Sequence, residues 1–363
     1  MNINSRQFDA VIIGAGQAGL AAGQLLQQHG LKFLILDEQA APGGNWRNYY
    51  DSLQLFSPAE YSALPGRSFP GSPTSYPARD QVVAYLESYA AHFQLPIRQG
   101  VQVKHVRSLS RGFEVESADG ECFSTRSVIV ASGGFSRPYV PDIPGLGLFK
   151  GRVLHSSQYR NTESFLGQRV VVVGAANSAV QIAYELAHVA MTTLATREKI
   201  RFFPQRMLNI DFHTWLKWTG LEKTRWLSDQ GTPVLDQGKY RRAIQSGLLQ
   251  RKPMFTSVTT DGVIWADGQQ ETIDSLVFAT GFLPNTPFLD GLPVQDQQGR
   301  LRQQNGLAQT VPGLFFVGLP RQRNFASATL RGVGPDVQHI LPHLIRHLKQ
   351  SELEVTEEMS TAP

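Results

Sequence analysis

Three glycines near the N-terminus have a spacing that can bring the backbone close to phosphate groups. They lie in the run Gly14-Ala15-Gly16-Gln17-Ala18-Gly19, which has the pattern G-x-G-x-x-G. In this pattern the first glycine makes a tight turn, the second lets a pyrophosphate approach the backbone, and the third lets a helix pack closely on a strand. Asp37 follows at the distance where a carboxylate can accept hydrogen bonds from both hydroxyls of a ribose. Together these residues predict a dinucleotide site.

The elements that must position these residues surround them in the sequence. Residues 8–13 are an apolar run typical of a buried parallel strand, and a helix is predicted after the glycines as far as His29, because its apolar residues recur with helical spacing. Gly30 ends this helix, and residues 33–36 are the next strand, which leads into Asp37. The N-terminus of the helix offers unpaired N–H groups and a partial positive charge to phosphates. The motif therefore has the strand, helix and second strand that it requires.

The same arrangement recurs in the middle of the chain. Residues 169–173 read as a strand, the run Gly174-Ala175-Ala176-Asn177-Ser178-Ala179 follows, and a helix leads to a second strand at 192–196. The turn at residues 266–268 precedes another buried strand, just as the turn at residues 118–120 precedes the strand that ends before Ser132 and Gly133. This repeat of unit order and spacing predicts two dinucleotide-binding units.

The second unit differs from the first at positions that contact a dinucleotide. Ala176 and Ala179 replace the second and third glycines, so this unit is expected to hold its ligand less tightly than the first. Arg197 stands where the first unit has Asp37, and its guanidinium can bind a ribose 2′-phosphate, which favours NADPH. The adjacent Glu198 can accept from ribose hydroxyls and repels a phosphate, which favours NADH. We expect both coenzymes to be used; the alternative is that both side chains are solvated surface charges.

The rest of the chain is interpreted around these two units. A helix is predicted from Asp80, as its N-cap, to Phe93, followed by an antiparallel meander over residues 101–130 and a proline-containing linker at 138–144. A last buried strand at 312–318 precedes a helix that begins near residues 327–330. We expect the second unit to be inserted into the first, which the C-terminal part completes.

Composition excludes several classes of protein. The chain has 363 residues and a formal net charge of +4, and Cys122 is its only cysteine, which rules out a disulfide reductase with a redox cysteine pair and is compatible with a reducing cytoplasm. The basic clusters at 197–206, 239–242 and 251–252 are more readily explained by attraction of anionic dinucleotides than by nucleic acid, since no nucleic-acid module is visible. Hydrolase chemistry is not expected, because G-x-S-x-G is absent.

Neither a membrane segment nor a metal site is expected. No apolar run is long enough to cross a bilayer, residues 1–7 lack the apolar core of a signal peptide, and the tail from Ser351 is polar and acidic. His339, His343 and His347 have helical spacing, but Pro342 is expected to interrupt that helix, and a solvated basic face is the preferred interpretation. The segment 202–249 is the least interpretable, and two roles stay open for it: shaping the pocket, or forming a homodimer contact.

Further motifs give the chain a family resemblance. It resembles the flavin-containing monooxygenases, in particular their short bacterial members, through the first glycine motif with Asp37, through Gly43-Gly44-Asn45-Trp46, and through Gly174-x-x-Asn177-Ser178 and Ala279-Thr280-Gly281. The most specific match is Phe149-x-Gly151-x-x-x-His155-x-x-x-Tyr159, which follows the family signature F-x-G-x-x-x-H-x-x-x-aromatic. The resemblance extends over essentially the whole chain.

The resemblance implies an α/β fold with two Rossmann-like domains, in which an NAD(P)H domain is inserted into an FAD domain as in disulfide reductases. The implied boundaries are 1–160 and 283–363 for the FAD domain and 161–282 for the NAD(P)H domain. The residues implied to bind FAD are Gly14, Gly16, Gln17, Gly19, Asp37, Glu38, Gly44, Asn45, Trp46, Ser57, Val103, Ser132, Gly133 and Leu319. Those implied to bind NADPH or NADH are Gly174, Ala176, Asn177, Ser178, Arg197, Glu198 and Gly281.

The activity implied is oxygenation of a small organic substrate by O2. In the family, reduced flavin forms a C4a-(hydro)peroxyflavin whose distal oxygen is attacked by soft nucleophiles such as sulfides and amines, and some members carry out Baeyer–Villiger oxidation of ketones. The candidates for direct roles in catalysis are Phe56 and Asn177; many members have an asparagine over the flavin where this chain has Phe56. Two alternatives stay open: an NAD(P)H oxidase that releases hydrogen peroxide, favoured by Phe56, and a non-enzymatic flavin redox sensor. His155 is interpreted as a structural hydrogen-bonding residue.

Overall fold

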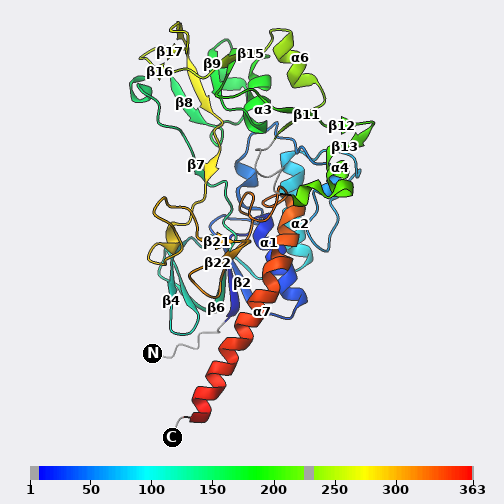
Figure 1. Cartoon of the computed structure of the whole chain (residues 1–363), viewed down its shortest axis with the longest axis vertical. Coiled ribbons are helices and arrows are strands. Elements are labelled where there is room, and N and C mark those ends of the chain that lie inside the picture. Colours follow the sequence, from blue (N-terminus) through cyan, green and yellow to red (C-terminus); the bar gives the residue numbers. More distant parts are fainter. Residues whose placement is uncertain (1–7, 225–232, 362–363) are drawn as a thin grey trace.

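The chain folds into two α/β units that lie one above the other (Figure 1). The structure is a computed structural model and describes residues 8–224 and 233–361. Residues 1–7, in which no signal peptide is expected, lie outside the described residues. The last two residues of the tail and part of the segment 202–249 also lie outside them. In the described part, no helix combines the length and the apolarity that a bilayer crossing needs.

The lower unit in Figure 1 contains a sheet in the strand order β21-β22-β23-β6-β1-β2-β3, with β4 and β5 as an antiparallel extension of β6. Strands β6, β1, β2 and β3 pair in parallel, as the glycine motif requires, and β23 joins β6 in parallel from the far end of the chain. The strands are β1 (Phe8–Ile13), β2 (Phe33–Asp37), β3 (Ile97–Gln99), β4 (Val103–Ser108), β5 (Phe113–Ser117), β6 (Cys122–Val130), β21 (Gln303–Gln304), β22 (Leu307–Ala308) and β23 (Leu314–Phe316).

Three helices cover one face of this sheet with apolar side chains. They are α1 (Gln17–Gln28), α2 (Arg79–His92) and α7 (Leu330–Thr361). A continuous core joins the buried alanines and leucines of α1 to the tyrosines of α2 and to the first turns of α7, where Val333, Val337 and Ile340 are fully buried. The C-terminal segment therefore completes the first unit through both β23 and α7, and the expected return of the chain is confirmed.

The upper unit repeats this design in the order β15-β10-β9-β19-β8. All four pairings are parallel, so β19, β9 and β10 correspond to β6, β1 and β2 of the first sheet. The two-unit α/β fold expected from the sequence is confirmed. The strands and helices are β8 (Arg152–His155), β9 (Arg169–Val173), β10 (Met191–Thr196), β15 (Gln250–Pro253), β19 (Ser275–Phe278), α3 (Asn177–Leu186) and α6 (Lys239–Gln245). Smaller strands flank it: β16 (Ser257–Val258), β17 (Gly262–Ile264) and β18 (Gln270–Thr272).

Two chain segments connect the units, and they pair with each other. Strand β7 (Arg137–Pro138) runs antiparallel to β20 (Phe282–Leu283), so the exit from the first unit and the return to it lie side by side. Strand β8 precedes the predicted boundary at residue 161, yet it belongs to the second sheet. The boundaries at 160/161 and 282/283 stay predictions.

A third region, between β10 and α6, extends to the right of Figure 1. It contains the pair β11 (Phe202–Pro204) and β14 (Val234–Asp236), the hairpin of β12 (Arg206–Met207) and β13 (Ile210–Asp211), and the helix α4 (Phe212–Thr219). Its apolar side chains Phe212, Leu216 and Leu235 pack against Phe56 of the first unit. This region, for which the sequence left two roles open, therefore contacts the loop that carries a candidate catalytic residue.

Two details of the predicted helices are wrong. Asp80 is not the N-cap of α2: the helix begins at Arg79, the Ala78 N–H donates to Gln81 Oε1 at 2.9 Å, and the Asp80 carboxylate pairs with Arg79. Pro342 does not interrupt the last helix, because α7 continues through it to Thr361. A proline removes a single backbone donor, and extensive burial of the adjoining turns can offset that loss.

Gly19 gives a direct test of helix–strand packing. A Cβ built at this position would lie 1.8 Å from the carbonyl oxygen of Gly14, which is backbone and cannot rotate away. We expect Gly19→Ala to lower the free energy of unfolding by at least about 2 kcal/mol, measured by urea denaturation, since overpacking forces the backbone to shift. Gly147→Ala is the matched control, because nothing lies within 4 Å of its Cβ. Equal stability of the two variants would contradict this account of α1.

Candidate functional site

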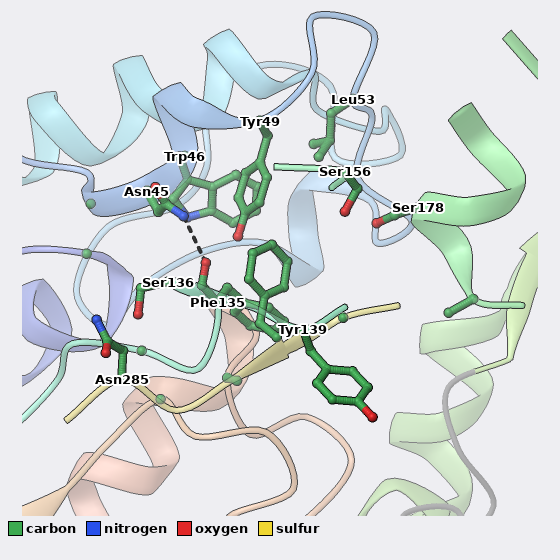
Figure 2. Close-up of a pocket in the computed structure, with 18 of the residues that line it drawn as sticks. Asn45, Trp46, Tyr49, Leu53, Phe135, Ser136, Tyr139, Ser156, Ser178 and Asn285 are labelled. Carbon is green, nitrogen blue, oxygen red and sulfur yellow. Dashed lines mark hydrogen bonds between the residues drawn. The ribbon is translucent and has the colours of Figure 1, made fainter. Parts of the chain in front are cut away.

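A cavity of about 920 Å³ is lined by residues of both units. The turn that leads from β1 into α1 and the turn that leads from β9 into α3 both face it, as do the ends of β2 and β10. In parallel α/β sheets, ligands bind at the carboxyl ends of the strands, and here two such edges meet at one cavity. Figure 2 shows labelled residues from both units around it: Asn45, Trp46, Tyr49, Leu53, Phe135, Ser136, Tyr139, Ser156, Ser178 and Asn285.

The first turn brings the backbone to the cavity, and close backbone contacts leave no room for a side chain at two of its glycine positions. A Cβ at Gly14 would lie 2.7 Å from the Ala131 carbonyl oxygen, and Gly14 has a φ of +106° that favours glycine. A Cβ at Gly44 would lie 3.0 Å from the Cα of Gly16. No side chain caps the N-terminus of α1, so its first N–H groups are directed at the cavity without a capping partner. These features fit a pyrophosphate bound at a helix N-terminus.

Asp37 lies at the end of β2 and is 4% exposed. Its carboxylate accepts hydrogen bonds from the backbone N–H groups of Ala15 and of Gln39, the latter at 2.7 Å. Burial raises the pKa of the carboxyl above its usual range, while the two N–H groups and the charge of Arg47 oppose the shift. Asp37 thus holds the glycine turn in place through the N–H of Ala15, and it also lines the cavity.

One buried polar atom at this site has no partner within the described chain. The Ser132 hydroxyl follows β6, lines the cavity and makes no hydrogen bond with described residues. Buried hydroxyls are normally paired, so an unpaired one that lines a cavity fits a bound polar ligand. With the glycine cradle and the uncapped helix, this makes the first turn chemically suited to a dinucleotide such as FAD.

The second turn has the same geometry with more side-chain bulk. A Cβ at Gly174 would lie 2.5 Å from the Ala279 carbonyl oxygen, the counterpart of the contact between Gly14 and Ala131. Ala176 precedes α3, which also has no side-chain cap. Asn177, in its first turn, donates its side-chain amide to the Pro233 carbonyl at 3.3 Å. Two turns of one design therefore face one cavity, the second narrowed by a methyl group.

Arg197 and Glu198 lie at the end of β10, line the cavity and are exposed. The backbone carbonyl of Glu198 accepts a hydrogen bond from Arg251, whose guanidinium also donates to Thr196. The hydrogen bonds from Arg251 hold the backbone of the loop after β10, and the side chains of Arg197 and Glu198 line the cavity. This position is compatible with binding of NADPH and with binding of NADH.

The structure brings most of the predicted residues to this cavity. Those that line it are Gly14, Gly16, Gln17, Asp37, Glu38, Gly44, Asn45, Trp46, Phe56, Ser57, Val103, Ser132, Gly133, Gly174, Ala176, Asn177, Ser178, Arg197, Glu198 and Gly281. Gly19 does not line it and serves the packing of α1 instead. Leu319 does not line it either: it is buried, and its N–H faces the side chain of Gln322 at 3.3 Å, while the neighbouring Gly318 lines the cavity. The binding roles of all these residues stay predictions.

Several lining residues were not predicted. Tyr49 and Tyr50 come from the loop after the first 3-10 turn, Phe135 and Tyr139 from the connection after β6, and Asn285 from the return segment. None belongs to a motif, although aromatic residues next to glycine-rich turns are a weak signal of a ligand site. The first loop also binds the second unit, since Tyr50 Oη donates to Gln181 Oε1 at 2.6 Å.

His155 lies at the end of β8 and contacts the segment that returns to the first unit. Its Nε2 donates to the Gly281 carbonyl at 2.9 Å, and its Nδ1 accepts from the Ser157 N–H at 3.2 Å, an assignment made from the hydrogen-bond network. The ring is 3% exposed and packs edge-on against Phe282. Burial lowers the pKa of His155, and the bond to Gly281 opposes the shift. The residue is structural in these contacts, as the sequence predicted.

The His155 contacts predict a pH dependence of stability. The unfolded side chain titrates near ~6.5, and the folded pKa lies lower, so this residue's contribution is complete above pH ~6.5 and is lost as pH falls toward the folded value. We expect His155→Gln to reduce the drop in the free energy of unfolding between about pH 7.5 and 5.5 relative to wild type. The exposed His92→Gln is the control and should keep the wild-type drop. An unchanged drop in His155→Gln would contradict the assignment.

No metal site accompanies the cavity in the described part of the chain. Nowhere in residues 8–224 or 233–361 do three His, Cys, Asp or Glu side chains gather as metal ligands would. The His339 and His343 rings lie near each other on α7, whereas His347 Nε2 approaches the Arg126 carbonyl at 3.2 Å.

Comparisons with known proteins agree with this geometry. The sequence pattern of a family described as pyridine nucleotide-disulphide oxidoreductase matches residues 11–318. The chain is 34% identical to an uncharacterised oxidoreductase (CzcO-like) of Geobacillus kaustophilus, with 93% of this chain and 99% of that protein covered. It is 32% identical to a probable indole-3-pyruvate monooxygenase (YUCCA1) of Arabidopsis thaliana, with 88% and 86% covered.

Among solved structures, the chain is similar to a flavin-containing monooxygenase from Stenotrophomonas maltophilia, at a TM-score of 0.84 and 33% identity. The similarity covers 94% of this chain and 99% of that one. These findings confirm the resemblance to flavin-containing monooxygenases that the motifs indicated. They support an oxidoreductase that uses FAD and a nicotinamide dinucleotide.

Proposed function

This chain belongs to the pyridine nucleotide-disulphide oxidoreductase family, and from that premise we propose that it is an FAD-dependent monooxygenase that uses NADPH, NADH or both, with O2. The observation that carries the proposal is the single cavity into which both glycine turns open, because it can hold two dinucleotides next to each other. A redox disulfide plays no part in it, since Cys122 is the only cysteine and is exposed.

Each part of the cavity has a role in this proposal. When bound, FAD supplies the redox chemistry, taking a hydride from the nicotinamide and activating O2. The uncapped N-terminus of α1 binds its pyrophosphate and Asp37 its ribose, whereas the second turn binds the nicotinamide dinucleotide. Thr329 and Leu330 place the start of α7 at the cavity wall, where its partial positive charge stabilises negative charge on a ligand. The apolar side chains of Leu53 and Phe56 line the cavity and reduce its contact with water.

The substrates proposed are small soft nucleophiles, namely sulfides and amines, and ketones by Baeyer–Villiger oxidation. Support comes from the resemblance and from the similar flavin-containing monooxygenase. One relative is named for indole-3-pyruvate, which is a 2-oxo acid. A ketone that carries a carboxylate is therefore a further substrate class to test.

An NAD(P)H oxidase is the second candidate, and Phe56 is the observation that favours it. Phe56 lines the cavity where many family members carry an asparagine, and a phenyl ring has no hydrogen-bonding group to stabilise polar species. Its ring stacks on His213 at a centroid distance of 6.0 Å, so it is held in a packed position.

The proposed function predicts oxygenated product. We expect the purified yellow protein, supplied with NADPH and methyl phenyl sulfide, to form sulfoxide in an amount that matches most of the NADPH consumed. Sulfoxide is measured by chromatography, and hydrogen peroxide is measured in the same samples as the control. Peroxide equal to the NADPH consumed, without product from a sulfide, an amine or a cyclic ketone, would instead identify an oxidase. Flavin binding without NAD(P)H turnover would identify a redox sensor.

Coenzyme use depends on Arg197 and Glu198. We expect Arg197→Gln to lower kcat/KM for NADPH by about tenfold and to leave that for NADH within about twofold, because a charge-assisted bond to the 2′-phosphate is lost. Glu198→Gln should raise kcat/KM for NADPH through loss of repulsion. Arg300→Gln, exposed and paired with Asp296 outside the cavity, is the control. A wild-type preference above about a hundredfold for either coenzyme would reject the proposed dual use.

A further inference from the structure

The loop that follows β2 bonds to both of the helices whose N-termini face the cavity. Trp46 Nε1 donates to the side-chain oxygen of Gln17, the first residue of α1. Further along the loop, the Tyr50 hydroxyl donates to Gln181 Oε1 on α3 at 2.6 Å. Tyr49 lies between these two anchors and lines the cavity. It therefore belongs to the stretch of wall that joins the first turn to the second.

This stretch of wall lies where two bound dinucleotides have to meet. Hydride transfer requires the donor and acceptor atoms to be in close contact. If one pyrophosphate is bound at each turn, the redox-active ends of FAD and of the nicotinamide dinucleotide come together between the turns. A side chain that points into the cavity from this wall is thus placed to contact the reacting groups.

The backbone and the ring of Tyr49 are both held in place. Its carbonyl accepts hydrogen bonds from Arg79, the first residue of α2, at 2.8 Å and from Arg160 at 3.0 Å. Its ring packs edge-on against Trp46, with the two ring centroids 5.6 Å apart and the ring planes at 79°. Figure 2 shows the Tyr49 hydroxyl directed away from the loop and into the cavity. The direction of this donor is therefore set by contacts within the protein.

The Tyr49 hydroxyl has no hydrogen-bond partner in the described parts of the chain, residues 8–224 and 233–361. Burial raises the pKa of Tyr49, so the hydroxyl keeps its proton and is a donor at neutral pH. A ligand that fills the cavity takes this hydroxyl out of water, which costs free energy unless the ligand accepts its hydrogen bond. The unpaired donor thus indicates an acceptor on the ligand.

Other polar side chains of the same wall have partners within the protein. The side-chain amide of Asn45 donates to the Phe135 carbonyl at 2.9 Å, and the hydroxyls of Ser57 and Ser62 share a hydrogen bond of 2.9 Å. Phe56 offers only carbon atoms to the cavity. Among the described residues from 45 to 57, the phenolic hydroxyl is thus the side-chain donor that faces the cavity without a partner.

We propose that the Tyr49 hydroxyl donates a hydrogen bond to the ring system of bound FAD, and that Tyr49 is a catalytic residue which makes the flavin easier to reduce. This inference rests on the FAD site of the proposed function and adds a residue that belongs to no motif. Reduction places negative charge on the flavin ring, whose carbonyl oxygens and ring nitrogens accept hydrogen bonds. A donor held in a fixed direction therefore stabilises the reduced flavin more than the oxidised flavin.

The test measures the reduction equilibrium of the bound flavin rather than turnover. Wild type, Tyr49→Phe and Tyr159→Phe, each with its FAD, are equilibrated without oxygen with a redox dye of similar potential, and absorbance gives the equilibrium constant between flavin and dye. We expect Tyr49→Phe to shift this constant about fivefold or more toward oxidised flavin, because a hydrogen bond to a charged group is lost. Tyr159→Phe is the matched control: it also removes a buried hydroxyl, but Tyr159 does not line the cavity, and its constant should stay within about twofold of wild type.

A constant for Tyr49→Phe within about twofold of wild type, or an equal shift in Tyr159→Phe, would overturn the inference. If Tyr49→Phe loses its flavin instead, titration of the apoprotein with FAD decides the matter. An FAD Kd raised at least about tenfold, with the Tm of the wild-type apoprotein, supports the contact, whereas a lower Tm shows that the hydroxyl acts in the fold and overturns it.

The result is independent of oxygenation. A shift specific to Tyr49→Phe supports this inference even if hydrogen peroxide is the product that forms, in which case the monooxygenase proposal alone fails. Sulfoxide formation by a protein whose flavin equilibrium does not respond to Tyr49→Phe has the opposite meaning: the monooxygenase proposal stands, and the role of Tyr49 is wrong.

Discussion

The close approach of backbone to backbone at two strand ends is the constraint on which this structure depends. Gly14 lies against the carbonyl of Ala131, and Gly174 lies against that of Ala279, each so near that a Cβ would overlap the oxygen. Each contact sets how tightly a turn closes over the neighbouring strand. It leaves the first N–H groups of α1 and α3 facing outward without side-chain caps. Backbone N–H groups are thereby arranged at both turns in the way that binding of a phosphate group requires.

The relative placement of the two units turns two such surfaces into one site. Polar contacts from the loop after Trp46 to the second unit hold that placement: Tyr50 bonds to Gln181, and Ser52 bonds to Glu185, both on α3. The antiparallel pairing of β7 with β20 holds the two crossings together, and His155 bonds to the carbonyl of Gly281 beside it.

The sequence predicted the local units and the return of the C-terminal segment to the first unit, but it missed most side-chain contacts between distant residues. Both glycine turns, their strands and the ends of β2 and β10 were predictable, because each depends on residues within one strand–helix–strand unit. The resemblance predicted that Leu319 lines the cavity, but the neighbouring Gly318 lines it instead. A motif does not locate a contact to within one residue. Asp80 is not the N-cap because α2 already begins at Arg79, and the Gln81 side chain accepts a hydrogen bond from the Ala78 N–H at that helix start.

A buried assembly around Asp211 had no signal in the sequence. It joins Tyr76 to Gln205 and His213 across more than a hundred residues, and no spacing rule connects such positions. Tyr49 belongs to no motif, and its position between the two turns depends on how its loop bonds to α1 and to α3. These contacts between distant residues could be found only from the fold, whereas each strand–helix–strand unit could be predicted from the sequence.

An anaerobic absorbance titration shows whether one cavity holds both dinucleotides within reach of each other. We expect the purified protein to retain flavin through gel filtration, and about one equivalent of NADPH or NADH to abolish the absorbance of the oxidised flavin. A protein that stays colourless in excess FAD, or whose flavin neither coenzyme reduces, would contradict it.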